Sequence, residues 1–94
     1  MKVRITSAAW RDLHAIGDWL ALADPDTAVT ITDELLDRAE QLGTVALHYP
    51  VVAKRDDAEL RKRSHRGYVI LYRTAAEVEV LRIVRERRDY LSLL

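Results

Sequence analysis

The last third of this chain decides its fold, and it reads LRKRSHRGYVILYR over residues 60–73 and VEVLRIVRERRDY over residues 78–90. Basic residues alternate with residues that favour strands, and successive side chains of a strand point to opposite faces of its sheet. Arg66-Gly67 and Thr74-Ala75-Ala76 are suited to turns. The sequence therefore predicts three strands, at about residues 59–65, 67–73 and 77–84. The last of them is apolar on both faces and is expected inside the sheet.

A short strand and two helices are predicted before this region. Residues 3–6 have a strand pattern, and Thr6 or Ser7 can cap the helix that follows. The apolar stripe of that helix consists of Ala9, Leu13, Ile16 and Leu20. Asp24-Pro25 marks a second helix, because Asp is a good N-cap and Pro suits the first helical position. Gly43 is expected to end it. Its apolar face consists of Ala28, Ile31, Leu35, Ala39 and Leu42.

Residues 44–58, which include Pro50 and Asp56-Asp57, are predicted to form a loop. Two helices joined by about four residues pack as an antiparallel hairpin, and such a hairpin must cover one face of the sheet. The predicted fold is therefore α+β in the order βααβββ, with the helical hairpin packed on one face of a mostly antiparallel four-stranded sheet. A chain of 94 residues is expected to form a single domain over residues 1–94.

Charge is distributed unevenly along the chain. Residues 1–47 contain four cations and eight acids, a net charge of −4, whereas residues 48–94 contain eleven cations and seven acids, a net charge of +4. This asymmetry indicates either a surface for an anionic partner or two solvated faces of opposite charge. The acids of the second helix are interpreted as a solvated face, on which Glu34 and Arg38 have the spacing of an ion pair.

Sequence patterns of common catalytic sites are mostly missing. There is no cysteine, the three histidines are far apart, and the three glycines are isolated, so no metal site and no cofactor are predicted. Residues 1–6 do not resemble a signal peptide, and no apolar run is long enough to span a bilayer, so a cytoplasmic location is expected. If the chain catalyses a reaction, its Lys, Arg, His and Tyr residues would suit phosphodiester cleavage by a ribose 2′-hydroxyl.

The order and spacing of these segments resemble the RelE/ParE superfamily of bacterial toxins from toxin–antitoxin pairs. The resemblance covers nearly the full length, and the combined order carries it more than any single motif. The matching stretches are SAAWRDLHAI at residues 7–16, LR at 60–61, GYVILYR at 67–73, VEVLRIV at 78–84 and RERRD at 85–89.

The superfamily divides into two functional branches. RelE-like members are ribosome-dependent mRNA endoribonucleases with basic residues before and after the hairpin glycine, an arginine after the last strand and a tyrosine in the tail. The resemblance implies, for this metal-independent alternative, the catalytic set Lys62, Arg85 and Tyr90, the last only with a shift of one residue. Leu60 and Val69 stand where that branch has two further cations.

ParE-like members lack the nuclease set, are implied to inhibit DNA gyrase, and end the last strand in an Arg/His-x-x-x-Asp segment, which residues 85–89 resemble. We therefore favour the ParE-like branch and expect no catalytic residues. A third hypothesis is a detoxified relative that serves only as an antitoxin partner or corepressor.

The ParE-like resemblance implies a toxin of a type II toxin–antitoxin module that binds gyrase and is neutralised by a cognate ParD-like antitoxin. A disordered antitoxin segment would fold over the toxin, with apolar anchors in a groove and acids on arginines. Operator DNA would be met only through the antitoxin, and no membrane partner is expected. The expected target-binding residues are Arg85, Arg87, Arg88, Asp89 and Tyr90. The expected antitoxin-binding residues are Trp10, Trp19, Leu22, Arg61, Arg63, Arg73 and Arg82.

Overall fold

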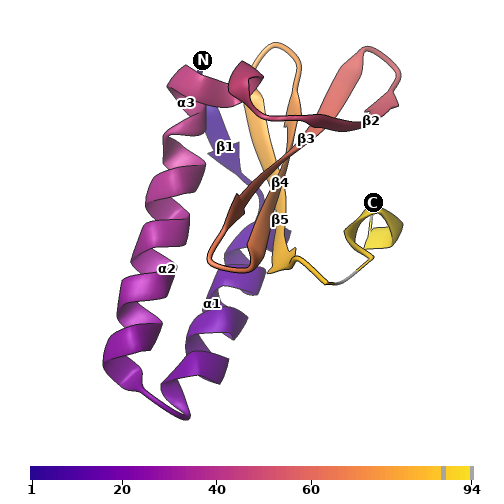
Figure 1. The fold of residues 1–94 in the computed structure, drawn as a ribbon. Coiled ribbons are helices and arrows are strands. Elements are labelled where there is room, and N and C mark those ends of the chain that lie inside the picture. The colour runs from indigo at the N-terminus through magenta and orange to yellow at the C-terminus, as the bar shows by residue number, and fades with distance from the viewer. Residues whose placement is uncertain (88, 94) are drawn as a thin grey trace.

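In the computed structural model, which describes residues 1–87 and 89–93, a helical hairpin lies against one face of a sheet and a short C-terminal turn lies beside the other face (Figure 1). The elements in chain order are β1 Val3–Ile5, α1 Ser7–Ala21, α2 Pro25–Glu40, α3 Leu42–Val45, the 3-10 turn η1 Ala46–His48, β2 Val51–Arg55, β3 Ala58–His65, β4 Tyr68–Thr74, β5 Val78–Arg85 and the 3-10 turn η2 Tyr90–Leu93. Across these residues, no helix combines the length and hydropathy needed to cross a membrane.

The sheet has five strands in the order β1-β5-β4-β3-β2, and it is mixed because β1 is parallel to β5 while the other pairs are antiparallel. The prediction of four strands was wrong, since β2 lies within the predicted loop. Asp56 adopts φ +53°, so Asp56-Asp57 forms a hairpin turn between β2 and β3. β2 is an edge strand with largely exposed or half-exposed side chains, so it lacks the apolar alternation that marks a strand in a sequence.

Both predicted helix starts are confirmed. The Thr6 hydroxyl accepts a hydrogen bond from the Ala9 amide, and the Asp24 carboxylate accepts bonds from the Asp26 and Thr27 amides. The predicted role of Gly43 was wrong, because α2 ends at Glu40 and Gly43 lies inside α3. A Cβ atom on Gly43 would lie 2.7 Å from the carbonyl oxygen of Met1, so glycine is needed there for close backbone approach.

The core forms between the hairpin and the inner face of β4, where Tyr68, Ile70 and Tyr72 are buried against residues of α1 and α2. The Tyr72 hydroxyl donates to the Ala46 carbonyl, and burial raises the pKa of Tyr72 to about 12. β5 lies inside the sheet as predicted, between β1 and β4.

The outer face of the sheet carries the C-terminal segment. The Lys62 ammonium of β3 lies 5.7 Å from the centroid of the Tyr90 ring, and the Ser64 hydroxyl donates to Glu86 at 2.8 Å. The chain after β5 is thus attached to β3 on the side opposite the hairpin (Figure 1).

The hairpin extends past the end of the sheet at which β3 turns into β4 and β5 ends (Figure 1). The buried residues of α1, Ala9 and Leu13, both lie in its first half. The end of the hairpin at which α1 connects to α2 therefore has a sheet-facing side that the sheet covers only in part.

Candidate functional site

A groove lies where the hairpin extends past the sheet. One hollow of about 460 Å³ separates α1 from the end of β5 and is lined by Asp12, Ala15, Ile16, Trp19, Tyr68, Ile83, Val84, Arg85 and Arg87. A second hollow of about 480 Å³ is lined by Leu20, Ile31, Arg66, Gly67, Tyr68, Arg85 and Arg87. Because the two hollows share Tyr68, Arg85 and Arg87, we treat them as one site, the hairpin groove.

The rim of the hairpin groove is basic. The Arg85 guanidinium lies 5.8 Å from the centroid of the Tyr68 ring, and Arg87 is exposed in the turn after β5. Within residues 1–87 and 89–93, neither Arg85 nor Arg87 forms an ion pair with a carboxylate. The apolar side chains that line the groove, which include Ile16, Trp19, Leu20 and Ile31, form its apolar floor. An apolar floor beside cations without a carboxylate partner suits an amphipathic segment that carries acids.

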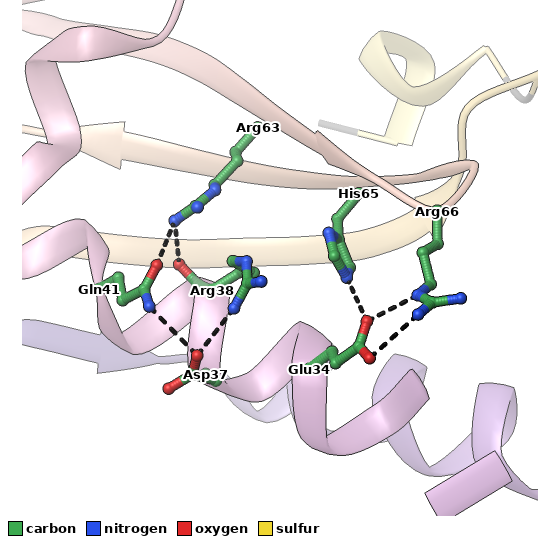
Figure 2. Close-up of polar contacts among 7 residues, drawn as sticks. All are labelled: Glu34, Asp37, Arg38, Gln41, Arg63, His65 and Arg66. Carbon is green, nitrogen blue, oxygen red and sulfur yellow. Dashed lines mark hydrogen bonds and ion pairs between the residues drawn. The ribbon is translucent and has the colours of Figure 1, made fainter. Parts of the chain in front are cut away.

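Arg66, the third cation of the rim, is held by Glu34 of α2 (Figure 2). Arg66 Nε lies 2.6 Å from Glu34 Oε1 and Arg66 Nη2 lies 3.2 Å from Oε2, while His65 Nε2 lies 2.7 Å from Oε1. Hydrogen bonds from Arg66 and then His65 lower the pKa of Glu34. The predicted Glu34–Arg38 pair was therefore wrong, because Arg38 instead pairs with Asp37 at 2.8 Å.

Two of the arginines expected to contact an antitoxin face the hairpin side of the sheet. Arg61 donates to the Tyr49 carbonyl at 2.6 Å and to Glu59 at 2.7 Å. Arg63 donates to the Arg38 carbonyl at 3.0 Å and to the Gln41 amide oxygen at 3.1 Å (Figure 2). Both guanidinium groups are thus bound to carbonyl and side-chain oxygens of the same chain.

Arg73 and Arg82 also have partners within the fold. Arg73 pairs with Glu79, which Arg4 contacts as well. Arg82 donates to Asp12 of α1 through Nε at 2.7 Å and Nη2 at 2.9 Å, and this pairing raises the pKa of Arg82. The four arginines expected to contact an antitoxin, Arg61, Arg63, Arg73 and Arg82, therefore differ from the cations that line the hairpin groove, which include the expected target-binding residues Arg85 and Arg87.

The three apolar residues expected to contact an antitoxin lie on two different sides of the hairpin. Trp19 lines the hairpin groove and is 62% exposed, and Leu22, at the end of α1, is 82% exposed. Trp10 lies nine residues before Trp19, which places it on the opposite side of the helix at about 100° per residue. Its ring centroid is 6.4 Å from that of His14, in a separate hollow that shares no lining residue with the groove.

The expected target-binding residues are also divided. Arg85 and Arg87 line the hairpin groove, Asp89 and Tyr90 follow on the C-terminal segment, and Arg88 lies outside the described residues. Tyr90 contacts Lys62 on the outer face. In the alternative catalytic set, Lys62 and Tyr90 thus meet, whereas Arg85 lies against Tyr68 on the hairpin side.

Sequence reasoning did not select Arg66 as a binding residue. Its place in a two-residue turn gave no sign of a partner, because Glu34 is 32 residues away. Within the described part of the chain, no three His, Asp or Glu side chains are grouped closely enough to hold a metal ion. The apolar and basic lining of the hairpin groove is suited to bind a partner segment.

These features define a small α+β domain with a groove suited to a protein segment. Residues 3–90 match the sequence model of the family described as "ParE toxin of type II toxin-antitoxin system, parDE". The chain belongs to this ParE toxin family. The fold is similar to a chain of the structure described as "Chromosomal ParDE TA system from P. aeruginosa", with a TM-score of 0.73 and 22% sequence identity over 90% of this chain and 95% of that chain. No curated protein sequence matches the chain.

Proposed function

We propose that this ParE-family toxin is neutralised by a cognate antitoxin whose amphipathic segment occupies the hairpin groove. The observation that carries this proposal is the pairing of an exposed apolar floor, which includes Trp19, with cations that have no acid partner in the described residues. Apolar anchors of the antitoxin would cover the floor, and its acids would meet Arg85 and Arg87.

We further propose that the toxin inhibits DNA gyrase in the cytoplasm by binding it, without catalysing a reaction. Family membership supports this proposal, and so does the position of Arg85 on the hairpin side, away from Lys62 and Tyr90 on the outer face. Because Arg85 and Arg87 line the groove, an antitoxin segment bound there would cover two residues expected to contact gyrase. Neutralisation would then follow from direct exclusion of the target.

The test is supercoiling of relaxed plasmid by purified gyrase in the presence of this protein. We expect inhibition with accumulation of cleaved DNA, and restored supercoiling when the co-encoded antitoxin is added. The double variant Arg85→Gln/Arg87→Gln should need about tenfold more protein for the same inhibition, because it lacks two charged contacts. The control Lys2→Gln/Lys54→Gln makes the same charge change outside the groove and should inhibit like the wild type.

Two other outcomes of this assay would indicate a different function. A folded toxin that stops cell growth without inhibiting gyrase would exclude gyrase as the target and favour ribosome-dependent RNA cleavage. A chain that neither inhibits gyrase nor stops growth, but still binds the antitoxin, would fit a detoxified partner or corepressor.

A further inference from the structure

We propose that Arg66, in addition to Arg85 and Arg87, binds a carboxylate of the antitoxin segment in the hairpin groove, and that Glu34 positions Arg66 for this contact. The inference rests on the proposed antitoxin function of the groove. It assigns a recognition role to a residue of the β3–β4 turn and a positioning role to a residue of α2.

The geometry of Arg66 leaves part of its guanidinium group available. Nε and Nη2 contact the two oxygens of Glu34, which occupies one edge of the planar group. A guanidinium has five N–H donors, so Nη1 and the second proton of Nη2 remain for another acceptor. The Arg66 side chain is 54% exposed and lines the groove beside Leu20 and Ile31. A carboxylate at that position could accept two parallel hydrogen bonds.

Glu34 is itself fixed in place. It lies on α2, and Oε1 contacts both Arg66 Nε and His65 Nε2 (Figure 2). The neighbouring charges on the same surface have separate partners: Asp37 pairs with Arg38, and Arg63 donates to the Arg38 carbonyl and to Gln41. Glu34 is therefore free to orient Arg66 without competition from Arg38 or Arg63.

The backbone of the turn supports a specific role for the side chain. Arg66 has φ +50° and Gly67 has φ +81°, the left-handed conformation at both central positions of a two-residue hairpin turn. Asn or Gly would adopt this conformation at position 66 with less strain than Arg. The arginine side chain gains its contacts with Glu34 in return, and these contacts direct it along the rim of the groove.

The decisive experiment measures affinity for the full-length antitoxin encoded beside the toxin gene, by calorimetry at about 0.15 M salt, where charges interact over about 8 Å. Glu34→Gln removes a negative charge from the toxin, so overall charge alone would strengthen binding of an acidic segment. Loss of positioning predicts the opposite, a decrease of about fivefold. The control Asp37→Asn makes the same charge change on α2 without touching Arg66 and should bind as tightly as the wild type or slightly tighter.

Substitutions of Arg66 complete the test. Arg66→Gln should bind about tenfold more weakly, and Arg66→Lys should be nearly as weak because an ammonium cannot make the paired contact. Arg38→Gln, which removes a cation of the same surface, should change affinity by less than twofold. Thermal unfolding of each variant verifies that it is folded.

Two results would overturn the inference while leaving the antitoxin function intact: binding by Arg66→Gln within twofold of the wild type, or tighter binding by Glu34→Gln. Failure of the unaltered toxin to bind the antitoxin would instead overturn the proposed function itself, and this inference with it.

Discussion

Asp12 joins α1 to the free edge of β5, and its removal should destabilise the fold strongly. β1 pairs with β5 only as far as Val80, so the edge of β5 beyond that residue has no strand partner. At this edge the Asp12 carboxylate takes the place of a strand partner. It accepts a hydrogen bond from the Ile83 amide at 3.0 Å and two hydrogen bonds from Arg82. Asp12→Ala therefore removes an ion pair and leaves a backbone amide without its acceptor.

The expected cost follows from these contacts. The side chains of Arg82 and Asp12 are only 24% and 15% exposed, so their bidentate pair should contribute about 2 kcal/mol. The lost acceptor of the Ile83 amide adds about 1 kcal/mol. Asp12→Ala should then lose about 3 kcal/mol of unfolding free energy, whereas Arg82→Met, which keeps the apolar stem and the Ile83 bond, should lose about 2 kcal/mol.

The assay is urea denaturation followed by circular dichroism, on both single variants and on the double variant. The ion pair can be lost only once, so the double variant should be about as unstable as Asp12→Ala, with a coupling energy of about 2 kcal/mol. Costs that add to about 5 kcal/mol in the double variant would refute the assignment. So would equal stability of Asp12→Ala and Arg82→Met, because Asp12 would then have no separate contact with Ile83.

Three further predictions concern the core, the N-terminus and the outer face. Burial raises the pKa of Tyr72 from 10 to about 12, so the wild type should lose about 2 kcal/mol as pH rises from 10 to 12, where the unfolded chain releases the phenolic proton first. Tyr72→Phe avoids this loss but leaves the Ala46 carbonyl unpaired, so it should be about 1 kcal/mol less stable at pH 7 and more stable at pH 12 in urea denaturation. Gly43→Ala should lose about 1–3 kcal/mol in the same assay, because its Cβ meets the Met1 backbone. Lys62→Ala should leave gyrase inhibition within twofold of the wild type, whereas loss of toxicity through lost RNA cleavage would support the nuclease alternative.

Local signals predicted most of the fold. The strands at 58–65, 68–74 and 78–85 lie within about one residue of their predicted positions, because alternation and the glycine turn are properties of short segments. β2 was missed since it pairs only with β3, and its stability comes from that partner more than from its own residues.

The charge asymmetry between the two halves had a physical cause that only the folded chain reveals. Glu34 meets His65 and Arg66, and Asp12 meets Arg82 across 70 residues, so acids of the first half neutralise cations of the second. Part of the asymmetry is therefore internal to the fold. A sum over sequence halves cannot separate cations paired in this way from those that remain for a partner.

Alternation along β3 placed Arg61, Arg63 and His65 on one face but could not determine which face the hairpin covers. The neighbouring strand did not resolve this, because Val69 and Leu71 on its outer face are as buried as Tyr72 on its inner face. In the folded chain, Glu34 contacts His65 and the carbonyl at Arg38 near the end of α2 accepts from Arg63, so the hairpin covers the face of β3 that carries these side chains. Among the described residues, the cations that line the groove lie in the β3–β4 turn, at the last position of β5 and just after it, whereas Arg61, Arg63 and Arg82 within the sheet are bound by oxygens of the same chain. In such a domain, the cations at the ends of strands are therefore better candidates for binding a partner than the cations that alternate with apolar residues along a strand.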